Sequence, residues 1–364
     1  MKIALTGGGT GGHVYPAIQV LQALKDTSDD SIEALYLGDR RGPEKDIVSS
    51  HGIRFSHIPS GKLRRYHSLQ NFTDLFRIIV GFVYSLVILR RFHPDILFSK
   101  GGFVSVPPVI AAKILRIPIV THESDIDPGL ANRINSRFVD AICIPYEQSR
   151  SHYASNLETF VTGNPVRTEL LHGDARRARM RYGIPEDRMF ILVLGGSQGA
   201  LEINRIIWQW AEEGIEELFI LHQSGQLTYK ELRKENYVTV PHISEGLGDL
   251  FSAADMVISR AGAGAIHEFA LNEIPMLLIP KGTDSSRGDQ IRNAELFSTN
   301  EAAFVIKDEE VTLENVKSTV LLVKEHREII KKMTDAAYQL VDPDAASKIS
   351  TVIKKYINKR EESV

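Results

Sequence analysis

The sequence predicts an α/β protein built from two similar halves, each with a doubly wound parallel sheet. Three observations lead to this prediction. Short apolar runs alternate with helical patterns along the chain, as they do in parallel sheets. Glycine-rich loops connect the first apolar run of each half to a helical pattern. The alternation also stops at a turn near residue 165 and then begins again.

The strands of the first half are expected in short apolar runs separated by helical patterns. The predicted strands are residues 3–6, 34–37, 95–99, 118–122, 141–144 and 159–161. In a parallel sheet of this kind, ligands bind at the carboxyl ends of the strands. The loops that follow these ends, and that we therefore expect to contact a ligand, are residues 7–13, 100–103 and 122–125.

The segment Gly163-Asn164-Pro165-Val166-Arg167 is predicted to be the hinge between two domains, since glycine, asparagine and proline together favour turns. The second set of predicted strands is residues 190–194, 218–221, 238–240, 256–259, 276–279 and 303–306. We therefore expect domains at residues 1–163 and 164–340 that face each other across a ligand cleft. The helix within residues 341–364 is expected to cross back onto the first domain.

The first glycine loop, Gly7-Gly8-Gly9-Thr10-Gly11-Gly12, is the segment around which the chain is organised. Glycine lets a ligand approach the backbone closely, and the start of the following helix offers N–H groups to an anion. His13 leaves the loop where a titratable side chain could face that ligand. The loop also fits the dinucleotide pattern G-x-G-x-x-G with Asp39 downstream, but a segment so rich in glycine meets that pattern by chance.

Composition argues against several classes of function. The net charge of −3 gives no electrostatic reason to bind nucleic acid. Cys143 is the only cysteine, so the chain cannot form an internal disulfide or a cysteine-based metal site. The N-terminus enters a predicted strand directly, which is not the pattern of a signal peptide. We therefore expect a protein of the cytoplasm.

The longest apolar stretch, residues 78–89, is too short to cross a bilayer. Arg90 and Arg91 follow it, and Lys62 and Arg65 precede its helix. Two interpretations stay open. The helix is a buried crossover of the first domain, or it also places an apolar face into an anionic membrane surface between its basic flanks.

Several short motifs occur in a fixed order along the chain. They are Gly-Gly-Thr-Gly-Gly-His at 8–13, Lys-Gly-Gly-Phe-Val-Ser-Val-Pro at 100–107, His-Glu-Ser-Asp at 122–125, Pro-Gly-Leu-Ala-Asn at 128–132, Gly-Asn-Pro-Val-Arg at 163–167, Gly-Gly-Ser-Gln-Gly-Ala at 195–200 and Asp-Gln-Ile-Arg-Asn-Ala at 289–294. As a set they closely resemble the MurG family, the UDP-N-acetylglucosamine:lipid I N-acetylglucosaminyltransferases of peptidoglycan synthesis. The resemblance covers residues 1 to about 340.

The resemblance implies a GT-B fold, with the lipid acceptor on the first Rossmann-like domain and UDP-GlcNAc mainly on the second. It implies an enzyme that transfers N-acetylglucosamine with inversion to the C4 hydroxyl of the muramyl sugar of lipid I, undecaprenyl-pyrophosphoryl-MurNAc-pentapeptide, to form lipid II. The enzyme would be a peripheral protein at the cytoplasmic side of the bacterial cell membrane. It could also interact with partners in a cell-wall synthesis complex. A UDP-GlcNAc 2-epimerase of the same fold and a nucleotide-sugar-binding regulator without turnover are the alternatives.

The same resemblance assigns the donor contacts. Arg167 and Ser197 would serve the phosphates, Ile243 would offer backbone hydrogen bonds to uracil, and residues 263–268 would form the phosphate loop and the ribose contact. Two further residues would bind GlcNAc hydroxyls, and the first glycine loop would meet the donor from the other domain. The full predicted set is Thr10, Gly11, Gly12, Arg167, Ser197, Ile243, Ala263, Gly264, Ala265, Ile266, His267, Glu268, Asp289 and Gln290.

Three side chains of the first domain are candidates for the catalytic base, namely His13, Glu123 and Asp125. Inverting transfer needs a base that takes the proton of the acceptor hydroxyl as it attacks. The positive end of the following helix favours the neutral form of His13, so we expect His13 to take the proton and Asp125 to orient the acceptor. Asp125-Ile126-Asp127 spells the D-x-D of metal-dependent glycosyltransferases, but it lies in the loop of the acceptor domain, and no metal or other cofactor is expected.

Overall fold

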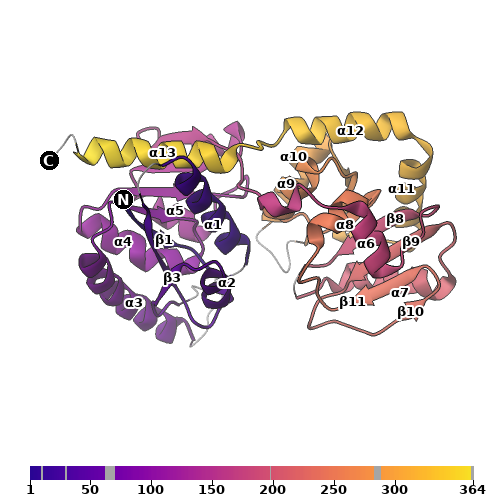
Figure 1. Ribbon diagram of the computed structural model, residues 1–364, viewed down its shortest axis with the longest axis horizontal. Coiled ribbons are helices and arrows are strands. Elements are labelled where there is room, and N and C mark those ends of the chain that lie inside the picture. The colour runs from indigo at the N-terminus through magenta and orange to yellow at the C-terminus, as the bar shows by residue number, and fades with distance from the viewer. Residues whose placement is uncertain (10, 29–30, 62–69, 197, 283–287, 362–364) are drawn as a thin grey trace. The chain divides into compact units, whose positions relative to one another are not determined.

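A computed structural model describes residues 1–364 except residues 10, 29–30, 62–69, 197, 283–287 and 362–364. The chain divides into two compact units (Figure 1). Unit 1 contains Met1–Val166 and Pro343–Val364, and unit 2 contains Arg167–Asp342. Each unit holds one seven-stranded sheet with helices packed against it, which confirms the predicted α/β class.

The sheet of unit 1 has the strand order β3-β2-β1-β4-β5-β6-β7, and all of its strand pairs are parallel. The strand order changes direction between β1 and β4, which makes this pair the switch point where such sheets bind ligands. The strands are β1 (Lys2–Thr6), β2 (Glu33–Gly38), β3 (Arg54–His57), β4 (Ile96–Ser99), β5 (Ile119–His122), β6 (Ala141–Ile144) and β7 (Glu158–Val161).

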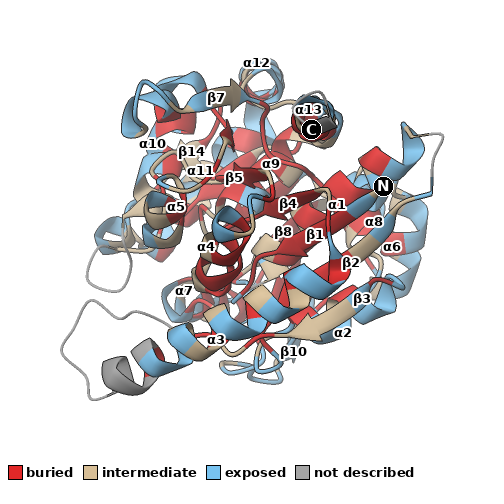
Figure 2. Cartoon of the chain, turned by 90° about the vertical axis from the view of Figure 1, so that its left-hand side faces the viewer, coloured by how far each residue is buried: buried red, intermediate tan, exposed pale blue. Residues whose placement is uncertain are grey.

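Alternate residues of these strands point to opposite faces of the sheet and build two cores. Ile3 and Leu5 pack with helices α1 and α13 on one face, whereas Ala4 packs with α3 and α4 on the other. Figure 2 shows β1, β4 and β5 buried within this unit. The helices of unit 1 are α1 (Gly11–Asp26), α2 (Glu44–Ser50), α3 (Gln70–Phe92), α4 (Val106–Ile114), α5 (Leu130–Asn135) and α13 (Ala345–Glu361).

The sheet of unit 2 has the order β10-β11-β9-β8-β12-β13-β14, in which only the β10–β11 pair is antiparallel. Its switch point lies between β8 and β12. The strands are β8 (Met189–Leu194), β9 (Leu218–Gln223), β10 (Arg233–Lys234), β11 (Tyr237–Val240), β12 (Met256–Ser259), β13 (Met276–Leu278) and β14 (Phe304–Val305). The helices are α6 (Ala175–Tyr182), α7 (Leu201–Glu213), α8 (Leu247–Ala253), α9 (Ala263–Leu271), α10 (Asp289–Thr299), α11 (Leu313–Glu325) and α12 (Arg327–Gln339).

The ends of some helices follow directly from the local sequence. The side chain of Asp174 accepts hydrogen bonds from two N–H groups at the start of α6, and Gly183 ends that helix in the left-handed conformation. The sequence did not predict β3 and β10. Each is an edge strand with a single neighbour and mostly polar residues, so neither carries the apolar run by which a buried strand is identified.

Candidate active site

The carboxyl ends of β1, β4 and β5 bring three loops of unit 1 together. The first glycine loop follows β1, Gly101 and Gly102 follow β4, and a loop that begins at Glu123 follows β5. Because β1 and β4 flank the switch point, the loops after them diverge and leave room for a ligand. His13, Glu123 and Asp125, the three candidates for the base, all lie at this edge.

Glu44, the first residue of α2, holds the first glycine loop in place. Its Oε1 accepts a hydrogen bond of 2.6 Å from the backbone N–H of Gly9. A Cβ atom at Gly8 would overlap this carboxylate, and Gly9 has a φ of +100°, which glycine adopts without strain. Burial raises the pKa of Glu44. Nothing in the local sequence marks Glu44, because it is 35 residues from the loop that it holds.

His13 lies in the first turn of α1, and its Nδ1 is 3.3 Å from the carbonyl oxygen of Lys100. A carbonyl oxygen only accepts, so Nδ1 carries the proton of this hydrogen bond. In the neutral imidazole, Nε2 is then the nitrogen that bears the lone pair. The backbone at the end of β4 thus sets the tautomer of His13, as a carboxylate does for the histidine of a serine-protease triad.

Glu123 is buried, and its carboxylate accepts four hydrogen bonds, three from its own loop and one from α5. Oε1 accepts from the N–H groups of Ser124 and Asp125, at 2.7 and 3.2 Å. Oε2 accepts from the N–H of Gly129 at 3.0 Å and from Nδ2 of Asn132 at 2.9 Å. Both oxygens are engaged, so an acceptor hydroxyl could reach Glu123 only by displacing one of these donors.

Lys100 is the buried cation of this cluster. Lys100 is 1% exposed, and its Nζ donates a hydrogen bond to the hydroxyl oxygen of Ser124. Burial lowers the pKa of Lys100 to about 8, although the nearby carboxylates of Glu123 and Asp125 act in the opposite direction. The sequence gives no sign of this role, since most lysines are exposed.

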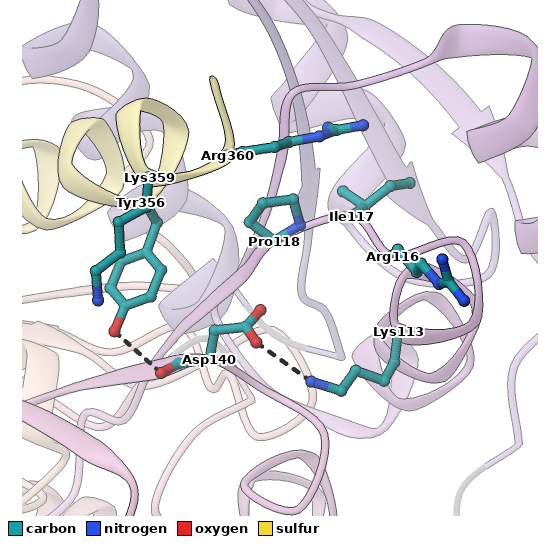
Figure 3. A pocket seen from close by; sticks show the side chains of 8 residues that line it. All are labelled: Lys113, Arg116, Ile117, Pro118, Asp140, Tyr356, Lys359 and Arg360. Carbon is teal, nitrogen blue, oxygen red and sulfur yellow. Dashed lines mark hydrogen bonds and ion pairs between the residues drawn. The ribbon is translucent and has the colours of Figure 1, made fainter. Parts of the chain in front are cut away.

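Two cavities of unit 1 lie at opposite edges of its sheet. One, of about 230 Å³, adjoins the first glycine loop and is lined by Gly9, Asp39, Arg41, Gly42, Glu44, Asp74, Arg77 and Phe103. The other, of about 360 Å³, is lined by eight residues, of which four are basic (Figure 3). Pro118 and Asp140 line this second cavity and directly precede β5 and β6, so it lies at the amino ends of the strands, away from the predicted ligand side.

In the D-x-D segment, Asp127 is close to a histidine. Asp127 lies 3.0 Å from Nε2 of His152, in the 3₁₀ helix that follows β6. Throughout the described part of the chain, no group of three or more histidine, cysteine, aspartate or glutamate side chains is placed to hold a metal ion.

In unit 2, the predicted donor residues Arg167 and Glu268 form an ion pair. Nε of Arg167 is 3.0 Å from Oε1 of Glu268, and the two side chains are 22% and 16% exposed. Burial raises the pKa of Glu268, and the positive charge of Arg167 opposes this shift. The motifs assign the two residues separately to the phosphates and the ribose, whereas the structure shows that they contact each other.

The start of α9 presents backbone groups rather than side chains. A Cβ atom at Gly262 or Gly264 would meet no heavy atom within 4 Å. The first N–H groups of a helix have no partner inside it and can bind an anion. Ile266 and His267 are fully buried, and Nδ1 of His267 donates to a backbone carbonyl one turn earlier at 2.8 Å. These two predicted residues could therefore contact a ligand only through their backbone.

Among the other predicted donor residues, two are already hydrogen-bonded within unit 2, three begin helices, and two lie outside the described residues. The backbone N–H of Ile243 donates to Oε1 of Gln223 at 2.9 Å, so a uracil contact there would use the carbonyl or displace Gln223. Oε1 of Gln290 accepts from the N–H of Lys281 at 3.0 Å. Asp289 is the first residue of α10, and Gly11 and Gly12 begin α1. Thr10 and Ser197 lie outside the described residues.

Helix α3 is buried along one side, as a crossover helix is, and exposed along another. Leu89 and Phe92 are buried against the sheet, and Phe82 and Leu86 pack partly against the same core. An apolar face nevertheless remains exposed, and Figure 2 shows exposed residues along α3. The apolar side chains of this face lie three or four residues apart, and their exposed fractions are between 44% and 67%. These residues are Phe76, Ile79, Val83, Tyr84 and Val87. Within the described residues, no helix combines the length and the apolar character needed to span a membrane.

Comparisons with known proteins agree with this architecture. Residues 3–144 match the glycosyltransferase family 28 N-terminal domain, and residues 190–349 match the C-terminal domain of the same family. Among solved structures, the chain is similar to Acinetobacter baumannii MurG, with a TM-score of 0.73 and 24% identity over 97% of this chain and 99% of that one. It is also similar in fold to UDP-GlcNAc 2-epimerase from Neisseria meningitidis, with a TM-score of 0.69 and 14% identity over 99% and 100% of the two chains.

Relatives with higher identity share one name. The chain is 40% identical to the UDP-N-acetylglucosamine–N-acetylmuramyl-(pentapeptide) pyrophosphoryl-undecaprenol N-acetylglucosamine transferase of Treponema pallidum, over 98% of this chain and 95% of that protein. It is 39% identical to the protein of the same name from Clostridium botulinum, over 98% of both chains. The chain therefore belongs to glycosyltransferase family 28, among the UDP-N-acetylglucosamine–N-acetylmuramyl-(pentapeptide) pyrophosphoryl-undecaprenol N-acetylglucosamine transferases.

Proposed function

We propose that this chain transfers N-acetylglucosamine from UDP-GlcNAc, with inversion, to the C4 hydroxyl of the muramyl sugar of lipid I and thereby forms lipid II. Membership of the transferase family supports the reaction. The structural observation that carries the proposal is the hydrogen bond between His13 and the carbonyl of Lys100. It places a histidine of defined tautomer beside a glycine loop, at the edge of the sheet where ligands bind.

His13 is the base in this proposal. With Nδ1–H bonded to a carbonyl, the neutral ring has its lone pair on Nε2 and accepts the proton of the acceptor hydroxyl as that oxygen attacks. Asp125 orients the acceptor. Glu123 has a different role from the one first considered for it, because its four hydrogen bonds hold the loop that carries Ser124 and Asp125.

Unit 2 binds the donor. Glu268 accepts hydrogen bonds from the ribose hydroxyls, while Arg167 and the N-terminal backbone of α9 stabilise the phosphates as negative charge develops on the leaving UDP. Asp289 and Gln290 contact the GlcNAc hydroxyls. The motifs add Thr10 and Ser197, for which the described residues provide no geometry.

A transfer assay with matched variants tests the proposal. Radiolabelled UDP-GlcNAc and a lipid I analogue are incubated with wild type, His13→Ala and His51→Ala. His51 is an exposed histidine on unit 1 and serves as the control. His13→Ala should lower kcat by roughly 10²–10⁴-fold and leave UDP affinity unchanged.

Two outcomes would contradict this part of the proposal. If wild type converts UDP-GlcNAc to its 2-epimer without labelling the lipid, the chain is an epimerase of the same fold. If His13→Ala keeps most of the wild-type kcat, His13 is not the base. Any loss of activity toward acid pH must then come from the protonation of another group.

We also propose that the exposed apolar face of α3 binds the anionic surface of the membrane that carries lipid I. The transfer of the apolar side chains of this face out of water is favourable, and Arg90 and Arg91, which could contact anionic lipid, follow at the last turn of the helix. Ile79, Val83 and Val87, each changed to Ser, should release the protein from anionic vesicles in a sedimentation assay. Phe82 and Leu86 are left intact, because they pack against the core.

The matched control for the membrane test is on unit 2. Leu321, Leu322 and Ile329 are exposed to a similar extent, and their change to Ser should leave vesicle binding unchanged. A folded α3 variant that still sediments with the vesicles would show that this face does not bind the membrane.

A further inference from the structure

Lys100 is an unusual lysine, because its charge is buried and, among the described residues, only one of its three N–H donors has an acceptor. Its Nζ donates to the hydroxyl of Ser124, and it makes no ion pair with a carboxylate among the described residues. Glu123 and Asp125 are near enough to favour the charged form but are not bonded to it. A buried charge with so few partners is costly to the fold, so its presence at the ligand edge calls for a role there.

The hydrogen-bonding capacity of the two groups fixes the direction of the contact. An ammonium group has donors and no acceptor, so the oxygen of Ser124 must accept from Lys100. The hydroxyl proton of Ser124 must then point to a different acceptor, and none is present among the described residues. Ser124 is half-buried, and its backbone is held by Glu123 and by Nδ2 of Asn164. The hydroxyl of Ser124 is therefore held in place as a donor, and its proton has no acceptor among the described residues.

We propose that Ser124 donates this proton to an oxygen atom of the bound acceptor, and that Lys100 is a positioning residue that orients and polarises the Ser124 hydroxyl. The inference rests on the proposed function, and it adds a contact for the acceptor that the motifs do not assign. The carbonyl of Lys100 also bonds His13. Lys100 therefore links the base to the loop that holds the acceptor, through its backbone on one side and its ammonium on the other.

The charge of Lys100 strengthens the contact. A donor whose oxygen accepts a hydrogen bond from a cation is more acidic, and its own hydrogen bond is stronger. The charged groups that act on the ammonium of Lys100 are the carboxylates of Glu123 and Asp125, whereas the hydrogen bond from His13 goes to the backbone carbonyl of Lys100. Because burial lowers the pKa of Lys100 to about 8, the ammonium is lost near that pH and the donor of Ser124 weakens.

Steady-state kinetics with the lipid I analogue and UDP-GlcNAc test the inference. Ser124→Ala should raise KM for the acceptor about tenfold, as expected for one charge-assisted hydrogen bond, with KM for UDP-GlcNAc unchanged. Ser124→Thr keeps the hydroxyl and should restore the wild-type KM. Lys100→Met should match Ser124→Ala, and the double variant should be no worse than either single one, because both remove the same contact.

The pH profile separates this role from a merely structural one. Acceptor KM of wild type should rise above about pH 8, whereas Ser124→Ala should lack this rise. Ser136→Ala, which removes a hydroxyl that bonds a carbonyl of its own helix end, is the control and should behave as wild type. If Lys100→Met does not fold, Ser124→Ala and its pH profile decide.

The failure of the inference can be told from the failure of the proposed function. Wild type that transfers GlcNAc while Ser124→Ala keeps its acceptor KM within about twofold would overturn the inference alone. Wild type that shows no transfer would overturn the proposed function.

Discussion

The ion pair between Arg167 and Glu268 allows donor binding to be separated from folding. Glu268→Gln keeps the size of the side chain and removes its charge. The carboxylate is 16% exposed and lies 3.0 Å from the guanidinium, so a ribose hydroxyl would donate to a charged and largely desolvated oxygen. Such hydrogen bonds contribute about 1.5–3 kcal/mol. Glu268→Gln should therefore weaken UDP binding about 10- to 100-fold, as measured by isothermal titration calorimetry.

Urea denaturation gives the second half of the experiment. Arg167→Ala leaves Glu268 buried without its positive partner and should lower the free energy of unfolding by up to about 3 kcal/mol. Adding Glu268→Gln to Arg167→Ala should recover part of this loss, because the isolated charge is then gone. Glu273→Gln, at an exposed carboxylate of the same unit, is the control for both measurements.

The result that would refute the reasoning is specific. If Glu268→Gln lowers the free energy of unfolding but binds UDP with the wild-type dissociation constant, the pair only stabilises unit 2. Glu268 would then be removed from the ribose site, although its burial and its contact with Arg167 would stand.

Three further predictions concern single positions. Gly264→Ala should keep or slightly raise the melting temperature, because the added methyl group meets open space and alanine favours the helix by about 0.5–1 kcal/mol. If a phosphate approaches the backbone there, the same variant should raise KM for UDP-GlcNAc. Gly8→Ala, whose methyl group would overlap Glu44, should instead lower the melting temperature. Gln290→Ala should lower the ratio of kcat/KM for UDP-GlcNAc to that for UDP-GalNAc, and an unaltered ratio would exclude Gln290 from reading the C4 hydroxyl. Lys100→Met should have a higher free energy of unfolding than wild type at pH 7. This difference should narrow between about pH 8 and 10.5, because the unfolded wild type binds more protons than the folded form over that pH range. A difference in free energy of unfolding that does not change with pH would contradict the burial of a charged Lys100.

The fold class could be predicted because the patterns that indicate it lie within short segments of the sequence. Buried parallel strands are mostly apolar, so twelve of the fourteen strands in the described residues could be predicted without any knowledge of their partners. The edge strand β3 (Arg54–His57) lacks that pattern, since it pairs with one strand only and three of its four residues are polar. The glycine loops are also local, because a loop that must approach a ligand or a carboxylate excludes side chains regardless of the rest of the chain.

The chemistry of the site depended on contacts that no local pattern contains. His13 and Lys100 are 87 residues apart, and Arg167 and Glu268 are 101 residues apart, so their pairing exists only once the strands have set the register of the loops. The motifs identified three of these four residues by type but gave them separate roles. Glu123 shows the same limit, since a carboxylate in the His-Glu-Ser-Asp segment suggests a base, whereas only the structure shows that this carboxylate accepts four hydrogen bonds. Motifs thus suggest candidates for the reacting groups, whereas the hydrogen bonds between distant segments show which of these candidates are already bonded within the fold.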